Sequence, residues 1–473
     1  MMGLPENWSA EELQSIVGAG GLVTDGDWIE SKDQDPEGDV RLIQLMDIGD
    51  GAFLDKSSRF LTAETAERLR CTFLKPGDVL VARMPDPLGR ACIFPGVGQR
   101  AVTAVDVLVW RSGEEAVSPE WIATAINSPE VRSQIRAEAS GTTRQRISGG
   151  RLKRLSIPIP PLPEQRRIVA KLDRLSARSA AARDHLARAT KLATRAKQAI
   201  LTEAFRGGVS SKEHLEYADR QEIDTPFTIP ATWEWKTAEE LCEWITKGTT
   251  PKRDDLNPDG GDVPFIKVYN LTFDGSLDFT KEPTFVSKSI HEGFLKRSKV
   301  FPGDILMNIV GPPLGKVSVV PETHPEWNMN QAIAVFRAKD GILPAFLAKW
   351  LLSEAYLSWA TALSKATAGQ RNLTLEICRR SPVPVPPLDE QAEIVRRIEA
   401  AFARIDRMTE EASRAAHLLD RLDERLLVKA FRGELVRQDP EDEPAEALLT
   451  RIRKARATAP KTKRGRRKKI DAE

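Results

Sequence analysis

One long segment of this chain occurs twice, and this duplication limits the folds that the chain can adopt. Three motifs recur 226 residues later: PGD at 76–78 and 302–304, EQ at 164–165 and 390–391, and AFRG at 204–207 and 430–433. A repeat of about 210 residues is far longer than the 20 to 50 residues typical of solenoid repeats. We therefore expect two similar halves related like the subunits of a dimer, an arrangement that commonly recognises paired half-sites.

Each copy opens with a segment of mixed pattern. In the first copy, short apolar or alternating runs are separated by Gly, Pro and Asp clusters, and they lie at 40–48, 78–84, 90–97 and 101–110. The second copy has the corresponding runs VPFIKVYNL, DILMNIV, GKVSVVP and AIAVFRA. These runs predict strands and turns, and helical segments follow near 119–140 and 344–365. Each module is therefore expected to be a mixed α/β, or α+β, domain.

The second part of each copy predicts a long helix. A proline and an acidic residue at 163–164, and an aspartate at 389 in the second copy, favour helix starts at these points. From Ile168 and from Ile394, steps of four and three residues fall almost always on apolar side chains. A strict 3.5-residue period sustained over some forty residues, or ~60 Å, is typical of a coiled coil.

The two helices are expected to pack antiparallel on each other as an intramolecular coiled coil, because both apolar seams lie in one chain and have matched lengths. A bundle with helices of another protein would explain the same pattern, and the sequence leaves that alternative open. The predicted seam residues are Ile168, Leu172, Leu175, Leu186, Ile200, Ile394, Ile398, Ile405, Met408, Leu419, Leu422 and Leu426.

Composition restricts the function classes. The chain has no apolar run of the ~18 residues that a bilayer requires, and its start lacks a secretory signal, so a cytoplasmic protein without a membrane partner is expected. The four cysteines are far apart, and the five histidines have no H-x-x-H spacing, so no metal site is predicted. Because the net charge is only +2, a nucleic-acid site would have to be a local patch.

Motifs of catalysis are missing from the sequence. It contains no Asn/Asp-Pro-Pro motif of adenine methylation and no G-x-x-x-x-G-K-[ST] phosphate loop. We therefore expect a non-catalytic chain that binds no cofactor itself. Two other classes stay open: a scaffold that binds only proteins, and a self-contained nuclease-methylase.

Several segments carry a resemblance to a known family. They are LPENW at 4–8, DGDWI at 25–29, VRLIQLMDIGDGAF at 40–53, LKPGDVLVARMPDPLGRACIFP at 74–95, PPLPEQRRIVAKLD at 160–173, AFRG at 204–207, TKGTTPKR at 246–253, VFPGDILMNIVGPPLGK at 300–316 and PPLDEQAEIVRRIE at 386–399. Together they extend over residues 1–436. This layout resembles the specificity (S) subunit, HsdS, of type I restriction-modification systems.

The resemblance implies a function and a set of partners. The two mixed modules would be target recognition domains, each reading half of a gapped double-stranded DNA sequence. The helices would space them and dock two methyltransferase (M) subunits, which motor-nuclease (R) subunits join. S-adenosylmethionine, ATP and Mg²⁺ would be used by these partner subunits.

The predicted organisation follows from the repeat and the resemblance. It consists of a first target recognition domain at 1–157, a central spacer helix at 158–207, a linker at 208–228, a second target recognition domain at 229–383, a C-terminal spacer helix at 384–436, and a short helix with a basic, disordered tail at 437–473.

Candidate DNA-binding residues are polar side chains in loops or at strand ends, because base edges are read by Arg, Lys, Asn and Gln. A single basic loop residue is more often solvated or bound to phosphate, so clusters at equivalent places in both halves carry more weight. The candidates are Lys56, Ser57, Arg59, Arg83, Arg90, Thr143, Arg144, Gln145 and Arg146 in the first half, and Lys247, Thr250, Lys252, Arg253, Asn308, Lys316, Gln370, Arg371 and Asn372 in the second.

Overall fold

The computed structural model describes residues 4–84, 87–141, 145–208, 225–364, 366–367 and 370–458. These residues fall into two compact units, one made of Met1–His185 with Ala415–Glu473 and the other of Leu186–Arg414. The chain passes from the first unit to the second within helix α5 (Leu162–Phe205) and returns within helix α11 (Leu388–Phe431). Most of the predicted linker and the basic run at 461–469 lie outside the described residues.

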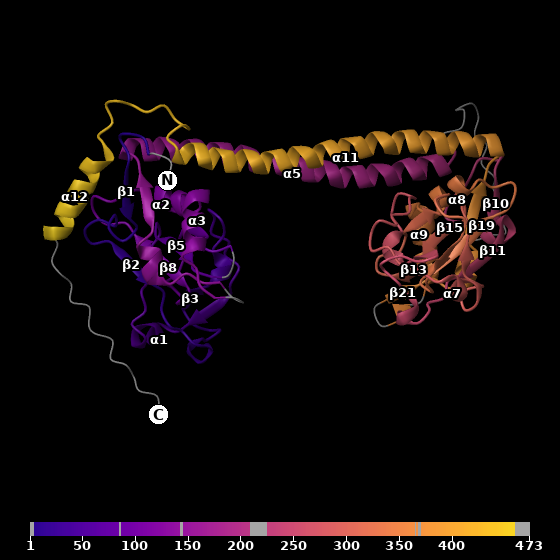
Figure 1. Cartoon of the computed structure of the whole chain (residues 1–473), viewed down its shortest axis with the longest axis horizontal. Helices are drawn as coiled ribbons and strands as arrows, with labels where there is room; N and C mark the ends of the chain where they lie inside the picture. Colours follow the sequence, from indigo (N-terminus) through magenta and orange to yellow (C-terminus); the bar gives the residue numbers. More distant parts are fainter. Residues whose placement is uncertain are drawn as a thin grey trace. The chain divides into compact units, whose positions relative to one another are not determined.

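The first unit contains a mixed α/β domain (Figure 1). Its strands are β1 (Ser9–Glu12), β2 (Leu22–Asp25), β3 (Val40–Ile43), β4 (Arg59–Leu61), β5 (Val79–Ala82), β6 (Ala91–Ile93), β7 (Ala101–Thr103), β8 (Val107–Arg111) and β9 (Ser156–Ile159). Its helices, besides the long ones, are α1 (Ala63–Arg68), α2 (Pro119–Ile126), α3 (Pro129–Ala137), α4 (Gly149–Lys153) and α12 (Ala445–Thr458).

The second unit contains a domain of the same kind (Figure 1). Its strands are β10 (Glu234–Thr237), β11 (Cys242–Lys247), β12 (Val263–Ile266), β13 (Phe285–Val286), β14 (Lys299–Val300), β15 (Ile305–Asn308), β16 (Val310–Gly311), β17 (Val317–Val319), β18 (Trp327–Met329), β19 (Ile333–Ala338), β20 (Ala366–Thr367), β21 (Gln370–Asn372) and β22 (Pro382–Val385). Its shorter helices are α6 (Ala238–Leu241), α7 (Lys288–Glu292), α8 (Pro344–Leu351), α9 (Glu354–Leu363) and α10 (Leu375–Arg379).

Sheet topology confirms that the two domains share one fold. The sheet ordered β2-β8-β5-β6 corresponds to β11-β19-β15-β17, and the parallel pair of β3 with β7 corresponds to β12 with β18. The registers of the paired strands also agree. Val79 lies opposite Trp110 in the first domain, and the residues 226 positions later, Ile305 and Phe336, lie opposite each other in the second. The sequence repeat is therefore a repeat of structure.

The four-stranded sheet of the first domain is buried on both faces. Val79 and Val81 point into a core shared with α2, whereas Leu80 and Ala82 point into a second core on the opposite face. The alternation follows from the two-residue period of a strand. A strand that is buried on both faces has to be a continuous apolar run, which is the pattern of VLVA at 79–82.

The repeated Pro-Gly-Asp motif pairs a buried aspartate with a half-buried arginine in each domain. Gly77 and Gly303 have φ angles of 92° and 88°, which glycine adopts without strain. The following aspartate then accepts hydrogen bonds from an arginine on the neighbouring strand: Arg111 donates to Asp78 at 2.6 and 2.7 Å, and Arg337 donates to Asp304 at 2.7 and 2.9 Å. The motif thus joins the turn to the sheet.

The repeated Glu-Gln motif fastens the start of each long helix to its domain. The buried Gln165 amide accepts a hydrogen bond from the Ser118 backbone N–H at 3.1 Å and donates to the Pro160 carbonyl at 2.8 Å. Gln391 accepts from the Leu343 N–H at 2.9 Å and donates to the Pro386 carbonyl at 2.9 Å. In both domains the side chain connects the long helix to the loop before α2 or α8.

The repeated AFRG motif fastens the other end of each helix. Phe431, at the end of α11, packs on Trp121 of the first domain with ring centroids 4.8 Å apart. Phe205, at the end of α5, packs on Phe346 and Trp350 of the second domain at 5.2 and 5.1 Å. Each domain core therefore contains the start of one long helix and the end of the other.

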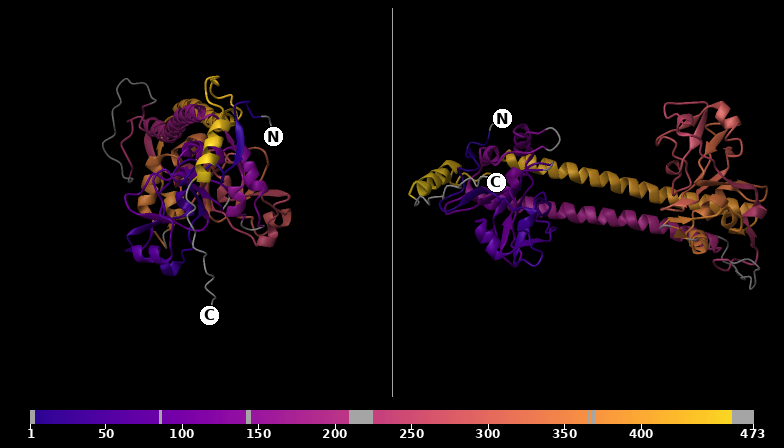
Figure 2. Two further views of the ribbon diagram at one scale, coloured as in Figure 1. Left: turned by 90° about the vertical axis from the view of Figure 1, so that its left-hand side faces the viewer. Right: turned by 90° about the horizontal axis from the view of Figure 1, so that it is seen from below.

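The two long helices pack on each other in antiparallel directions, and Figure 2 shows both as continuous ribbons. In the first unit, the early part of α5 meets the late part of α11, where Arg183 pairs with Asp420 at 2.9 Å and with Asp423 at 2.7 Å. In the second unit, the late part of α5 meets the early part of α11, where Lys197 pairs with Asp406 at 2.6 Å. The expected intramolecular pair is present.

The structure corrects two of the predicted seam positions. Met408 and Leu422 are 68% and 46% exposed, and the half-buried stripe of α11 passes one residue later, through Thr409 and Asp423. Asp423 can lie there because its carboxylate accepts hydrogen bonds from the buried Ser179 hydroxyl at 2.8 Å and from Arg183. A pattern based on apolar residues predicts Met408 and Leu422, which are adjacent in sequence to the polar residues Thr409 and Asp423 that lie on the stripe.

The other predicted seam residues differ in burial. Those nearest the domains are buried, namely Ile168, Leu172, Ile394 and Ile398. The others are half-buried, namely Leu175, Leu186, Ile200, Ile405, Leu419 and Leu426. Among these, Leu175, Ile200 and Leu426 still pack against a domain core. Two paired helices leave most seam side chains partly exposed, whereas a helix covered by a domain can bury them fully.

Helix α12, expected as a short helix in the C-terminal segment, packs on the first domain. Leu448, Leu449 and Ile452 join the core of that domain. Arg451 pairs with Glu115 at 3.0 Å, and Arg453 pairs with Glu11. This helix lies outside the two-fold repeat of the sequence.

We predict that Gln165→Ala lowers the free energy of unfolding of the first unit by about 1–3 kcal/mol, because it leaves a buried N–H and a buried carbonyl unpaired. Gln391→Ala should act equally on the second unit. Denaturant unfolding measures both effects, and Arg166→Ala, at an exposed neighbouring position, serves as the control. Equal stability of Gln165→Ala and Arg166→Ala would contradict the proposed role of Gln165.

Candidate nucleic-acid interface

Several candidate DNA-binding residues lie on the surface of the domains. In the first domain these are Lys56, Arg59, Gln145 and Arg146. In the second they are Lys247, Thr250, Lys252, Arg253 and Asn372. Most of these side chains are free to reach a partner molecule, although Arg146 pairs with Asp106 at 3.0 Å.

Three candidates are buried and hold their own domain together. Ser57 donates to the Leu42 carbonyl and to Asp47, so it fixes the loop that carries Lys56 and Arg59. Arg83 is buried and pairs with Asp25 at 3.3 Å, and burial lowers the pKa of its guanidinium. These contacts argue against base contacts by Ser57 and Arg83, because a buried side chain cannot reach a groove.

Asn308 is the third buried candidate, and it shapes the loop that carries Lys316. Its amide donates to the Val310 and Pro313 carbonyls at 3.3 and 2.8 Å and accepts from the Lys316 N–H at 2.8 Å. Lys316 is half-buried, and burial lowers the pKa of its ammonium group. Arg90 in the first domain is likewise half-buried.

The structure brings separate candidate segments together in each domain. In the second domain, β21, which contains Gln370, Arg371 and Asn372, pairs with β16, a strand that begins two residues after Asn308. In the first domain, Arg83 accepts a backbone hydrogen bond from Ile147, next to Arg146. Both pairs occupy equivalent places in the repeat. Thr143 and Arg144 lie outside the described residues.

Sequence patterns missed four exposed aromatic side chains on the domains. Trp28 in the first domain, and Trp244, Phe273 and Phe294 in the second, are large apolar groups that remain in contact with solvent. A sequence window shows an aromatic residue but not its exposure. The Lys316 ammonium nitrogen lies 5.8 Å from the centroid of the Phe273 ring.

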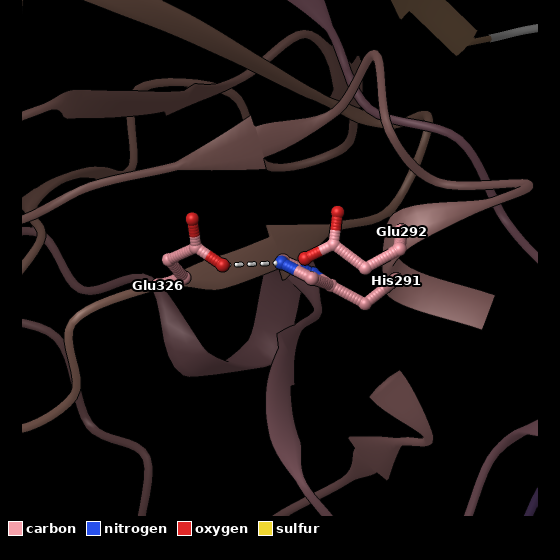
Figure 3. Close-up of side chains that lie close together, drawn as sticks. All are labelled: His291, Glu292 and Glu326. Carbon is pink, nitrogen blue, oxygen red and sulfur yellow. Dashed lines mark hydrogen bonds and ion pairs between the residues drawn. The ribbon is translucent and has the colours of Figure 1, made fainter. Parts of the chain in front are cut away.

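A cluster of His291, Glu292 and Glu326 has the residue types of a metal site (Figure 3). The His291 Nε2 atom lies 2.8 Å from a Glu326 oxygen. The Lys299 ammonium lies 2.9 Å from Glu292 and 3.5 Å from Glu326, so a cation of the chain already pairs with both carboxylates. The hydrogen bond from His291 holds the pKa of Glu326 below its usual value. We interpret the cluster as a structural network.

The cysteines have the environment of structural residues. Cys71, Cys92, Cys242 and Cys378 are free and buried. Burial raises the pKa of each thiol to about 12. Because the thiolate is the reactive form, these side chains are poor nucleophiles.

Comparison with known proteins identifies the family. A family model described as the type I restriction modification DNA specificity domain matches residues 61–187 and 230–414. The specificity subunit of the type I restriction enzyme EcoBI from Escherichia coli is 32% identical over 355 residues, which cover 72% of this chain and 73% of that subunit. This chain belongs to the family of type I restriction-modification specificity subunits.

Further relatives agree with this family. The EcoKI specificity subunit of Escherichia coli strain K12 is 26% identical over 368 residues, covering 75% of each chain. The crystal structure of the HsdS subunit from Thermoanaerobacter tengcongensis superimposes with a TM-score of 0.54 at 22% identity, covering 91% of this chain and 98% of that one. A chain solved in work on complex assembly and conformational transition of the type I R-M system superimposes with a TM-score of 0.72 at 22% identity. The match covers 92% of this chain and 100% of that one.

Family membership settles the broad function. The chain is a DNA specificity subunit with two recognition domains, the non-catalytic recognition component of a type I restriction-modification system, and it assembles into that complex. None of the helices in the described part of the chain is both long enough and apolar enough to cross a membrane.

We predict that Arg83→Ala lowers the stability of the first unit by about 2 kcal/mol, because it removes a buried charge from its partners. In contrast, Lys252→Ala and Arg253→Ala should leave stability within about 0.5 kcal/mol and weaken DNA binding. Thermal unfolding and equilibrium binding of the assembled complex separate the two effects. If Arg83→Ala had normal stability but weakened DNA binding, Arg83 would be a DNA-contacting residue and its structural role would be contradicted.

Proposed function

We propose that each recognition domain reads one half of a bipartite, gapped double-stranded DNA target. The observation that supports this most directly is that one fold occurs twice with different exposed side chains at equivalent places. Gln145 and Arg146 follow the helical segment of the first domain, and Asn372 follows that of the second. A common scaffold with different polar residues suits two different half-sites.

We further propose that α5 and α11 set the length of the gap. Each is a continuous helix of 44 residues, or about 66 Å. Each starts at one domain through a buried glutamine and ends in the core of the other through a buried phenylalanine. A helix fixed at both ends changes length only when residues are added or removed.

The same helices are proposed to dock two methyltransferase subunits. Leu192 on α5 and Leu418 on α11 are equivalent in the repeat, 226 positions apart, and they are 60% and 61% exposed. One lies in each unit. An exposed leucine kept at the same place in both copies supports two equivalent binding sites for one kind of partner.

The partner subunits would perform the chemistry. The methyltransferase subunits would use S-adenosylmethionine, and the motor-nuclease subunits would use ATP and Mg²⁺. We place the assembled complex in the cytoplasm, where it meets double-stranded DNA.

Inserting one heptad after His185 and a second after Arg414 tests the gap. Seven residues lengthen each helix by about 10 Å and preserve the seam period, so the gap should grow by up to about three base pairs. Both half-sites should stay unchanged. Sequencing of methylated adenines in cells that express each form measures the gap, and a lengthened subunit that modifies the original target would contradict the proposal.

Replacing Leu192 and Leu418 by aspartate tests the docking sites. The double variant should lose both methyltransferase subunits and each single variant should lose one, because burying a carboxylate against an apolar surface is costly. Native mass spectrometry of the reconstituted complex counts the subunits. Thr194→Asp, on another exposed face of α5, is the control. Full occupancy of the double variant would exclude these leucines as docking residues.

A further inference from the structure

A tight turn after helix α7 presents an aromatic ring among basic side chains. The helix ends at Gly293, and the next residue, Phe294, is 61% exposed. Lys296 and Arg297 follow and are also exposed, whereas Leu295 between them is fully buried. The turn thus directs one apolar and two cationic groups to the surface.

The buried side of the turn is held by hydrogen bonds. The Leu295 and Ser298 N–H groups donate to the Ile290 and Leu295 carbonyls, each at 2.9 Å. The Asn328 amide, oriented with its nitrogen toward the turn, donates to the Ser298 carbonyl at 2.9 Å and accepts from His291 Nδ1. Glu326 holds the other ring nitrogen of His291, as Figure 3 shows.

This network lowers the entropy cost of using the turn as a contact. The backbone on both sides of Phe294 is already fixed, so binding would order only a few side-chain torsions. The cluster of His291, Glu292 and Glu326, which has the residue types of a metal site, thus stabilises the turn that carries Phe294.

The turn is locally basic. From Lys288 to Val300, both included, there are four Lys and Arg residues and one acidic residue, Glu292, which is paired with Lys299. The whole chain carries a net charge of only +2. Within the second unit, α7 and β21 lie at the end of the domain away from α5 and α11 (Figure 1). A local cationic surface on a DNA specificity subunit favours contact with phosphates.

The first domain has the same helix without the exposed ring. Helix α1 is capped by Thr62 as α7 is capped by Ser287, and the buried Ala66 occupies the place of His291. The C-cap of α1 is the half-buried Leu69, and the residue after it, at the place of Phe294, is the exposed Arg70. The exposed ring therefore distinguishes the two domains, as expected for a residue that takes part in reading only one half-site.

We propose that Phe294, Lys296 and Arg297 form a DNA contact of the second recognition domain. The ring packs against a base in a groove, and the two cations bind the flanking phosphates. Phenylalanine makes such apolar contacts with thymine methyl groups or between base steps. This inference rests on the proposed reading of one half-site by each domain.

Variants of the intact methyltransferase complex test the contact. The probe is a duplex carrying the target identified by sequencing methylated adenines, and its affinity is measured over a range of salt concentrations. Phe294→Ala should weaken binding by about tenfold or more and leave the salt dependence unchanged, whereas Phe294→Tyr should bind nearly as wild type. Lys296→Ala with Arg297→Ala should reduce the slope of log affinity against log salt by about two.

Lys236→Ala is the matched control, because Lys236 is a half-buried lysine of the same domain that is paired with Glu234 on β10. It should bind DNA as wild type. Full affinity of Phe294→Ala for the wild-type target would overturn the inference and leave the bipartite reading intact. Loss of methyltransferase subunits from Phe294→Ala would overturn it in favour of a protein contact. A wild-type complex without a two-part target would instead refute the proposed function.

Discussion

The architecture depends on fixing each long helix at both of its ends. A paired helix is stiff along its length, but without a fixed start its direction relative to a domain would be set only by a flexible joint. Gln165 and Gln391 remove that freedom, because each buried amide bonds both to the helix start and to a neighbouring loop. Phe205 and Phe431 do the same for the helix ends by entering aromatic clusters.

Much of the fold could be predicted from the sequence because the duplication makes the signals redundant. The Pro-Gly-Asp turn, the Glu-Gln pair and the AFRG motif occur at one spacing, and each has a buried structural role. The seam of α11 was harder to predict. Its register is set at Asp423 by hydrogen bonds from Ser179 and Arg183, and a pattern based on apolar residues cannot detect a satisfied polar pair.

The candidate interface was less predictable for a related reason. Polarity and loop position selected Ser57, Arg83 and Asn308, but these side chains are buried and bind backbone groups or carboxylates of their own domain. Loop residues of one type can stabilise the loop or face a ligand, and only the tertiary structure distinguishes the two. Exposure likewise reveals Phe294, which in sequence has the same pattern as a core aromatic residue.

Divergence between the two helices explains why they pair with each other. Helix α5 contains ten Lys and Arg residues against four Asp and Glu, whereas α11 contains eight against ten. Two α5 helices from different chains would bring together like charges, and Asp423 would lose Arg183 if two α11 helices paired. The Arg183 contacts with Asp420 and Asp423 and the Lys197 contact with Asp406 all join the two different helices. Charge thus favours pairing within one chain over pairing of identical helices from two chains, which keeps two different recognition domains in one subunit.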